Sequence, residues 1–548
     1  MRRVKPIIIG HIGVALALCL SPVQIAQSLT RGQEKQATRH ERAAALVAEG
    51  AAAIERLDMT AAQASFQQAL ELEPRNVEAH TYLGVIADRA GNLKEAESHF
   101  AQAARFAPDS PSTRNNYGAI LLRLGRAAEA AIEFKASLRA DPKQVNAMVN
   151  LAQIYVAGGT PEEMKAARDL FVKAQAIAPD AEIALSLILT SLRLRDQAAA
   201  IDAYHDYAQR LAGASDKVKS SAARLELGNA LLAAGLNTEA VAELSAVAEL
   251  EPQNVEALIA LARGHRALGR VAAAGRTLEA AVARGVESSA LYAELADLYE
   301  SIGRYENAIP VMRLAVEHEP QNENYRFRYA LLLINSQAPK AAIIRLEEAL
   351  KLFPRSTRLW FALGLAHFTE HQAVEAENDF RRVLELDPKA TPALAYLGLA
   401  YSDQGRYAES IPFYERALAS DDKIATTYYL LADALLKQAP NETARPESLL
   451  VRALALDPTL TAARLALGKL YLRTERPAEA LTQLERVVAD DPKLAEAYYQ
   501  LGRTLIRLKR AEEGKTALDK FKKLSEGQKV EVDEERRELV RRLAAVRF

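Results

Sequence analysis

Proline returns at a regular interval through most of this 548-residue chain, and each time it closes an apolar helical stretch. Neighbouring prolines of this kind lie 34 residues apart over long runs of the sequence. The series comprises Pro74, Pro108, Pro142, Pro179, Pro252, Pro320, Pro354, Pro388, Pro458 and Pro492. Val286 and Asp422 hold the same place where a proline is missing. Because single cores stop growing at about 250–300 residues, the period predicts a row of similar small units.

Each period carries the same marks, which indicate two helices joined by a turn. In residues 77–110 the marks are Leu83-Gly84, Gly91, Ala96 and Phe100. The next period has Tyr117-Gly118, Gly125, Ala130 and Phe134 at the same places. The residues between the marks are rich in Ala, Leu, Glu and Arg, which are strong helix formers. An all-α fold is therefore predicted.

The marks have physical reasons. A small residue midway along the first helix lets the two helices of a unit approach closely. A large residue shortly before it, such as Trp360, Tyr292 or Leu258, is expected to fill the space between units. Glycine after the first helix takes the left-handed conformation without strain. These glycines are Gly91, Gly125, Gly159, Gly235, Gly269, Gly303 and Gly405.

With these marks the chain resembles the tetratricopeptide repeat family, whose 34-residue helix-turn-helix units stack into a right-handed superhelix, an α-solenoid. About fourteen units fit between Ala43 and Leu524. Two of them carry insertions, after Gly159 and around residues 438–446, and the unit at 182–220 is degenerate. We predict an N-terminal array over 43–211 (repeats 1–5), a polar connection and hinge at 212–220, and a C-terminal array over 221–525 (repeats 6–14). Residues 526–548 read as a charged capping helix.

The N-terminus has the pattern of an export signal. Arg2, Arg3 and Lys5 precede a short apolar run, and Ala26-Gln27-Ser28 offers small residues for a peptidase. We therefore expect residues 1–28 to be a signal peptide, residues 29–42 to be a polar linker, and the protein to reside in a bacterial periplasm or envelope. The alternative is a membrane anchor formed by residues 6–21, which is the only membrane contact that we expect.

Charge and cysteine content narrow the range of protein classes, although a local basic patch stays possible. Lys plus Arg number 70 against 71 for Asp plus Glu, so no overall field draws the chain to nucleic acid. The single cysteine, Cys19, permits neither a disulfide within the chain nor a cysteine-based metal site. No cofactor motif is found, and we expect none to be bound.

Two stretches of the first helices are candidate binding sites for a protein or peptide. The first is an N-terminal amide cluster that consists of Asn115, Asn116, Asn146, Asn150 and Gln153. Asn116 and Asn150 lie 34 residues apart and are expected to stack as rungs that pair with the backbone of an extended peptide. Ordinary solvated amides are the alternative interpretation.

The second candidate lies in the C-terminal half. We call the second, fifth, ninth, twelfth and thirteenth residues of each first helix the groove positions. The candidate site there comprises Phe361, Phe368, Tyr429, Lys469, Arg473, Tyr499, Arg503 and Arg507. Apolar and aromatic residues among cations favour a partner segment that is hydrophobic and partly acidic. Burial of these side chains by the array itself, or by a dimer, is the alternative.

Catalytic chemistry has one weak candidate. His367, Glu370 and His371 match the H-x-x-E-H pattern of an inverted zinc protease. However, His367 holds a packing position and His371 the helix-stop position of the repeat, and no third ligand follows. We therefore expect no metal site and no enzyme, but a scaffold that binds partner proteins. The alternative is a regulatory or substrate-recruiting subunit for an enzyme or assembly system encoded on another chain.

Overall fold

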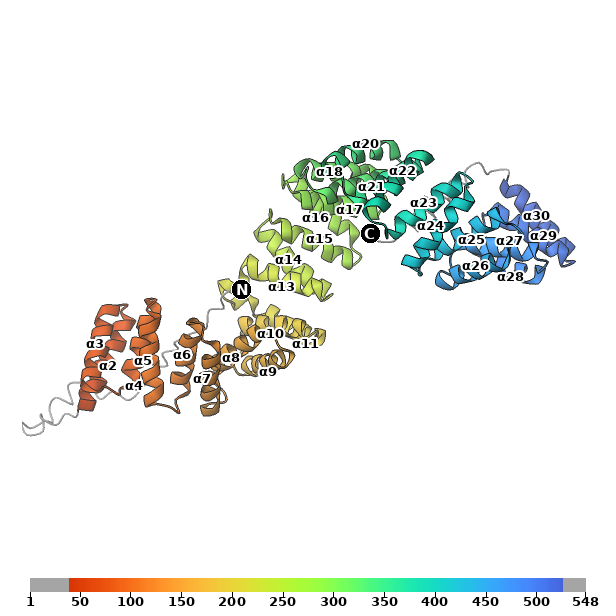
Figure 1. Ribbon diagram of the computed structural model, residues 1–548. Coiled ribbons are helices and arrows are strands. Elements are labelled where there is room, and N and C mark those ends of the chain that lie inside the picture. Colours follow the sequence, from red (N-terminus) through yellow and green to blue (C-terminus); the bar gives the residue numbers. More distant parts are fainter. Residues whose placement is uncertain (1–38, 526–548) are drawn as a thin grey trace, which may run out of the picture. The chain divides into compact units, whose positions relative to one another are not determined.

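The computed structural model describes residues 39–525, and these residues form helices and turns with no strand (Figure 1). Fourteen helix-turn-helix pairs follow one another in this part of the chain, which confirms the predicted all-α solenoid of about fourteen units. The predicted signal peptide and the predicted capping helix lie outside the described residues. Among the helices of residues 39–525, none combines the length and the apolar character that a membrane span requires.

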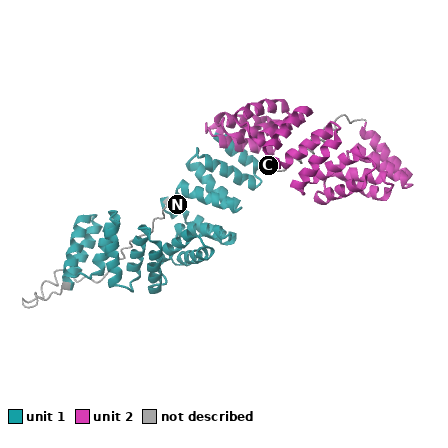
Figure 2. Cartoon of the chain, in the orientation of Figure 1, with its two compact units in different colours: residues 1–281 teal, residues 282–548 magenta. Residues whose placement is uncertain are grey.

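The chain divides into two compact units, residues 1–281 and 282–548 (Figure 2). The pairs that begin in the first unit are α2 (Arg39–Glu55) with α3 (Met59–Leu72), α4 (Val77–Arg89) with α5 (Leu93–Phe106), α6 (Pro111–Arg123) with α7 (Ala127–Ala140), α8 (Val145–Gly158) with α9 (Pro161–Ile177), α10 (Ala181–Arg193) with α11 (Gln197–Arg210), α13 (Ser221–Ala233) with α14 (Asn237–Leu250), and α15 (Val255–Ala267) with α16 (Val271–Ala283). A short turn η2 (Leu211–Gly213) and the helix α12 (Asp216–Lys219) precede α13.

The second unit holds the remaining seven described pairs. They are α17 (Ser289–Ser301) with α18 (Tyr305–His318), α19 (Glu323–Asn335) with α20 (Pro339–Leu352), α21 (Thr357–Thr369) with α22 (Ala373–Leu386), α23 (Thr391–Asp403) with α24 (Tyr407–Ser420), α25 (Ala425–Gln438) with α26 (Ala444–Leu456), α27 (Thr461–Arg473) with α28 (Pro477–Asp490), and α29 (Ala495–Arg507) with α30 (Ala511–Ser525).

Small residues midway along the first helices allow the close approach that the sequence predicts. A Cβ atom on Gly364 would lie 2.7 Å from the Phe380 ring, and one on Gly398 would lie 2.7 Å from the Tyr414 ring. Phe380 and Tyr414 are fully buried. The aromatic ring of the second helix therefore occupies the space that a side chain at the glycine would need.

The helix-stop glycines adopt the predicted left-handed conformation, for example φ +81° at Gly91 and +73° at Gly405. Six other residues take this conformation at φ values from 59° to 64°, namely Leu57, Arg195, Gln337, His371, Glu475 and Lys509. The turn of the repeat thus keeps its shape where the sequence does not supply glycine, although such backbone costs roughly 1–2 kcal/mol for a residue with a Cβ atom.

The insertion after Gly159 lengthens one second helix. Helix α9 has 17 residues, whereas α7 has 14. Thr160 and Glu163 form a reciprocal capping box at its start, with a proline in the first turn. The extra residues are therefore absorbed as helix, not as loop.

The large residue in fourth position of the first helix also makes a hydrogen bond. In five described pairs its side-chain nitrogen contacts the carbonyl oxygen of the proline six residues earlier. The distances are 3.1 Å for His80 to Pro74, 2.9 Å for Arg114 to Pro108, 2.7 Å for Arg326 to Pro320 and 3.0 Å for Trp360 to Pro354, and Arg464 contacts Pro458 in the same way. These bonds tie each first helix to the turn that precedes it.

The same fourth position faces a residue of the second helix, 19 positions further along the chain. Arg114 donates to Glu133 over 2.8 Å, and Arg224 lies 3.6 Å from Glu243. Arg464 donates to Gln483 over 3.4 Å, and His80 and His99 bring their Nδ1 atoms to 3.1 Å. A polar pair across the two helices is therefore a recurring part of this repeat.

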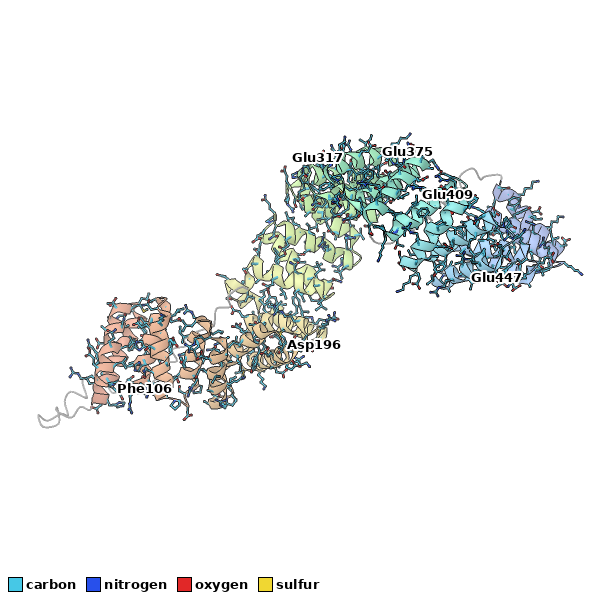
Figure 3. All side chains as sticks on the ribbon, in the orientation of Figure 1. Phe106, Asp196, Glu317, Glu375, Glu409 and Glu447 are labelled. Carbon is cyan, nitrogen blue, oxygen red and sulfur yellow. The ribbon has the colours of Figure 1, made fainter. Side chains whose placement is uncertain are left out.

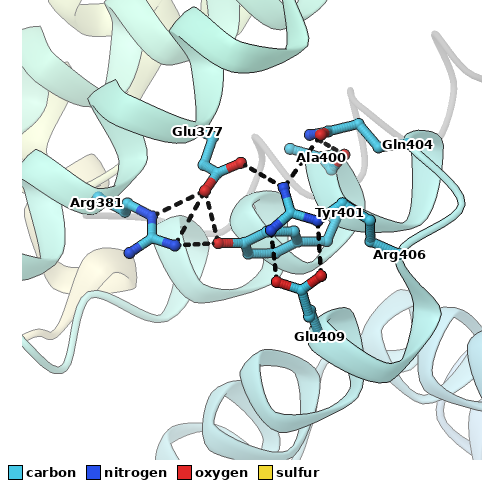
Figure 4. Close-up of polar contacts among 7 residues, drawn as sticks. All are labelled: Glu377, Arg381, Ala400, Tyr401, Gln404, Arg406 and Glu409. Carbon is cyan, nitrogen blue, oxygen red and sulfur yellow. Dashed lines mark hydrogen bonds and ion pairs between the residues drawn. The ribbon is translucent and has the colours of Figure 1, made fainter.

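An arginine at the start of the second helix joins consecutive pairs (Figure 4). Arg406 donates to Glu409 over 2.7 Å and to Glu377 of the preceding pair over 3.0 Å. Its guanidinium also lies 4.3 Å from the centre of the Tyr401 ring, whose hydroxyl donates to Glu377 over 2.7 Å. Arg126 with Glu97 and Glu129, and Arg476 with Glu447 and Glu479, repeat the two ion pairs. We call these three groups the arginine bridges.

Candidate ligand-binding surfaces

The N-terminal amide cluster lies on α6 and α8, and its members differ in accessibility. Asn115 and Asn150 are buried, with 3% and 0% of their surface exposed. Asn150 Nδ2 donates to Asn115 Oδ1 over 3.3 Å, so these two amides join the neighbouring first helices. Asn116 and Asn146 are half-buried. A ligand would therefore reach the cluster through Asn116 and Asn146 in preference to the buried pair.

Gln153 is the remaining member of the cluster. Its residue is half-buried, but its Oε1 atom is buried and accepts no hydrogen bond from the described residues. An amide oxygen in that state gains a partner when a donor enters the site. The peptide-binding role of the cluster remains a prediction.

Several contacts between neighbouring first helices join residues 35 positions apart, one more than the repeat, whereas Arg358 with Asn324 keeps the spacing of 34. Besides Asn115 and Asn150, the spacing of 35 joins Arg328 to the Ala293 carbonyl, Asn335 to Glu300, and Arg507 to the Leu472 carbonyl. Helical side chains lean toward the N-terminus of their helix, so Arg328 and Arg507 reach carbonyl oxygens one position before their own place in the repeat. Asn150 thus pairs with Asn115, one position off the 34-residue period, and the role of Asn116 and Asn150 as rungs for a peptide remains a prediction.

The aromatic residues at the start of the C-terminal candidate site are part of the core. Phe361 and Phe368 are 4% and 1% exposed. The ring centres of Phe361 and Tyr396 lie 5.3 Å apart, and those of Phe368 and Tyr396 lie 6.1 Å apart. Tyr396 belongs to α23, so the next first helix covers both rings. Here the array buries the groove positions itself, and only a rearrangement would bring a ligand to them.

The end of the candidate site is open by contrast. On α29 the groove positions Glu496, Tyr499, Arg503, Ile506 and Arg507 are all exposed, and on α27 Lys469 and Arg473 are exposed as well. Tyr499 and Ile506 leave 39% and 49% of their surface accessible. Tyr429, on α25, is half-buried. We call the exposed set Lys469, Arg473, Tyr499, Arg503, Ile506 and Arg507 the terminal surface.

Contacts within the terminal surface hold its side chains in place. Arg503 lies over the Tyr499 ring, 5.6 Å from its centre, and Tyr499 contacts Phe521 of α30 at 5.2 Å between ring centres. Arg507 donates to the Leu472 carbonyl oxygen over 2.6 Å. The tyrosine is therefore packed on one face and accessible on the other.

The charge of the terminal surface is positive. Its four cations, Lys469, Arg473, Arg503 and Arg507, accompany a single acid at a groove position, Glu496. Lys469 binds this carboxylate at 2.6 Å. Burial alone would raise the pKa of Glu496, but the bonds from Lys469 and Gln500 lower it, so the acid stays ionised. Three of the four cations have no such acid beside them at a groove position.

The H-x-x-E-H motif does not bring its histidines together as ligands. His367 Nδ1 lies 2.6 Å from Asp379 Oδ2 of α22, and both side chains are about one-tenth exposed. Burial raises the pKa of Asp379, and the bond from His367 opposes that shift. His371 has the left-handed backbone of the helix stop, as its place in the repeat predicts. Across residues 39–525, no three His, Cys, Asp or Glu side chains are placed to share a metal ion.

Sequence reasoning missed the arginine bridges and the fourth-position pairs. The bridges have a signal in the sequence, since each such arginine has an acid three residues later and another 29 residues earlier. The signal of the fourth-position pairs is two polar residues 19 positions apart. Reading the repeats for pairs of residues, and not for single positions, would have found them.

Family models place the chain among known proteins. Models described as tetratricopeptide repeat match residues 39–111, 118–182, 231–322 and 327–528. These matches take up most of the sequence, and the chain belongs to the tetratricopeptide repeat family. No curated protein matches the chain.

Solved structures with a similar fold are distant in sequence. The Cut9–Hcn1 hetero-tetramer of the APC/C is 16% identical, with 85% of this chain and 96% of that chain covered and a TM-score of 0.38. Yeast Tom70 is 15% identical over 92% of this chain and 96% of its own, with a TM-score of 0.34. YrrB, described as a TPR protein with an unusual peptide-binding site, is 17% identical over 34% of this chain and 95% of its own, with a TM-score of 0.29.

Proposed function

We propose that this chain is a non-enzymatic scaffold that binds a segment of a partner protein on its terminal surface. The single observation that carries the proposal is the change in exposure along the groove positions. Apolar residues at these positions are buried on α21, whereas all five groove positions of α29 are exposed. Exposed aromatic and arginine side chains that cluster on one surface are the residues that most often dominate protein interfaces.

The chemistry of the terminal surface defines the kind of partner. Tyr499 and Ile506 offer apolar contact area, and Arg473, Arg503 and Arg507 offer cations around it. A partner segment with an apolar anchor and flanking carboxylates would satisfy both. Arginine binds a carboxylate through two parallel hydrogen bonds, which makes such a contact directional as well as charged.

Site-specific photocrosslinking in the native cells tests this proposal. A crosslinking amino acid in place of Tyr499 is expected to capture a segment that contains acidic and apolar residues. The matched control carries the same group in place of Ile132, which is 61% exposed on the second helix α7. Equal capture at both positions, or a crosslink from position 499 to residues 526–548 of the same chain, would contradict the proposal.

Affinity for the captured segment provides a quantitative check. Tyr499→Ala combined with Arg503→Ala is expected to weaken binding by about ten-fold or more, because each side chain contributes energy at the centre of the surface. The double variant Tyr429→Ala with Tyr499→Ala should lose no more than Tyr499→Ala alone if the half-buried Tyr429 is not a contact. Circular dichroism confirms that the helices are intact.

Export belongs to the same proposal. The charged start, short apolar run and small residues of the first 28 positions support a signal peptide and a location in a bacterial envelope. Cell fractionation with N-terminal sequencing of the mature protein tests this directly. A mature chain that begins at Met1 and stays in the cytoplasm would contradict it.

A further inference from the structure

A small cavity in the second unit lies between α18, α19 and α20. Its volume is about 190 Å³, and its lining consists of Arg313, Val316, Glu317, Arg326, Tyr329, Arg345 and Glu348. This volume is well above the roughly 10–15 Å³ that a single water needs. Arg326 and Tyr329 are the fourth and seventh residues of α19, so neither holds a groove position. The cavity is thus separate from the surface proposed above to bind a partner protein.

The cavity occurs where this repeat departs from the fourth-position pairs. Arg114 and Arg224 each face a glutamate 19 residues further along, Glu133 and Glu243. Arg464 faces an amide, Gln483. The residue in that place for Arg326 is a second arginine, Arg345, and both line the cavity. A position that elsewhere holds an anion or a neutral group therefore holds a like charge here.

Acids near the cavity offset only part of the charge. Arg313 binds Glu317 at 3.1 Å, and Arg345 binds Glu348 at 2.7 Å. Arg326 donates its Nε to the Pro320 carbonyl oxygen and makes no ion pair within the described chain. Three guanidinium groups thus line the cavity with two carboxylates, which leaves one positive charge in excess.

We propose that this cavity is a binding site for a small oxyanion, such as phosphate or a carboxylate. A guanidinium has five N–H donors, and each ion pair or carbonyl contact above uses only some of them. An anion between Arg326 and Arg345 takes the place that Glu133 and Glu243 hold in their repeats. Arg313 and Arg345 are about half exposed, at 57% and 50%, so the anion can enter from solvent. Glu317, which Figure 3 labels, is the lining carboxylate of α18.

Isothermal titration of the full chain with sodium phosphate, at an ionic strength held constant with sodium chloride, tests the site. Saturable binding of one phosphate per chain is expected. Titration with sodium acetate forms the second arm and shows whether a carboxylate serves as the oxyanion. Arg345→Glu supplies the carboxylate from within the chain, as Glu133 does for Arg114, so it should fold normally and weaken anion binding at least about ten-fold.

Two further variants complete the test. Arg345→Gln removes the charge without adding an acid and is expected to weaken binding in the same direction. Arg382→Glu is the matched control. Like Arg345, Arg382 lies on a second helix and forms an ion pair with the residue three positions later, Glu385, at 2.5 Å. Unlike Arg345, it does not line the cavity. It should bind the anion as the unaltered chain does. Absence of saturable binding of both anions, or equal binding by Arg345→Glu, overturns the proposal.

Discussion

At the scale of single residues, a glycine and an aromatic ring define the close contact within a pair. Gly364 has no room for a Cβ atom because the Phe380 ring lies 2.7 Å from where it would stand. Pairs that have alanine at the same place, such as Ala262 and Ala330, have Leu278 and Leu346 where Phe380 stands. Glycine is also found opposite leucine, as in Gly228 with Leu244 and Gly468 with Leu484, but a glycine opposite an aromatic ring leaves no room for a Cβ atom.

Gly364→Ala is accordingly expected to destabilise its pair by about 1–3 kcal/mol, as overpacking of a filled core does. Phe380→Leu in the same chain should recover part of that loss, because it recreates the alanine–leucine combination of other pairs. A double-mutant cycle, measured by the protection of α21 and α22 amides from hydrogen exchange, gives the coupling. Strictly additive effects would show that the two residues do not share this space.

Single positions could be predicted from the sequence where the backbone or the close packing dictates them. The helix-stop glycines are of this kind, and so is the unusual backbone of His371. The exposure of groove positions could not be predicted, because it depends on how the neighbouring helices cover each side chain, and α29 is the last first helix that the structure describes. Tyr396 covers Phe361 and Phe368, whereas Tyr499 remains accessible.

At the scale of helices, the arginine bridges join only some neighbours. Arg406 links Glu377 of α22 to Glu409 of α24. Burial alone would raise the pKa of Glu377, but the hydrogen bond from Tyr401 and the bonds and charges of Arg381 and Arg406 lower it. Glu377→Gln is expected to leave each pair folded but to speed hydrogen exchange in α24. The difference in exchange rate between the variant and the unaltered chain should shrink in 1 M salt, because the Debye screening length there is only about 3 Å.

Glu385→Gln is the comparison for this variant. It removes the carboxylate of an ion pair within α22, Arg382 with Glu385, that does not reach the next pair. Exchange in α24 should stay unchanged. If Glu385→Gln and Glu377→Gln act alike, then the bridge does not couple the pairs.

The histidine pair of α4 and α5 predicts a dependence of stability on pH. Burial lowers the pKa of His80, and burial together with His80 lowers that of His99, with Glu95 acting weakly in the other direction. Both groups bind protons less readily in the folded state than in the unfolded state. Their contribution to stability is therefore complete above about pH 6.5, the ordinary value for histidine, and declines as the pH falls below it.

Replacing His80 by Arg and His99 by Glu transfers the Arg114–Glu133 pair to this repeat. The double variant should lose most of the change in α4 and α5 hydrogen-exchange protection between pH 7 and pH 5, after correction for intrinsic rates. Arg114 and Glu133 in the next pair show that the geometry accepts the exchange. If the pH dependence of this protection were unchanged in the double variant, then His80 and His99 would not be its cause.

At the scale of the molecule, each helix makes its substantial contacts with helices close to it in the sequence. Stability in such an array is approximately a sum of terms for single pairs and for neighbours. Deletion of residues 495–548 should therefore remove the helical signal of α29 and α30 and leave the remaining pairs folded. Binding to the terminal surface should be lost with them. Loss of helical signal throughout the chain would contradict this additivity.

The repeat made the architecture predictable, because a period of 34 residues with fixed small and large positions admits few alternatives. Contacts between repeats were harder to predict. The amides that pair are Asn115 and Asn150, which lie 35 residues apart, one residue off the period. The proposed anion site depends on one residue, Arg345, which stands where other repeats have Glu133 or Glu243. This difference is visible only when the residue pairs of the repeats are compared with one another.

Contacts restricted to neighbours have a consequence for how two ligands would coexist. Communication between sites requires an element with two arrangements that both ligands bias. The cavity at α18–α20 and the terminal surface at α27 and α29 share no helix, and no substantial contact joins the two sets of helices. Binding of an anion in the cavity should leave the affinity of the terminal surface for its partner protein unchanged. The chain can then hold both ligands at the same time, and neither alters the binding of the other.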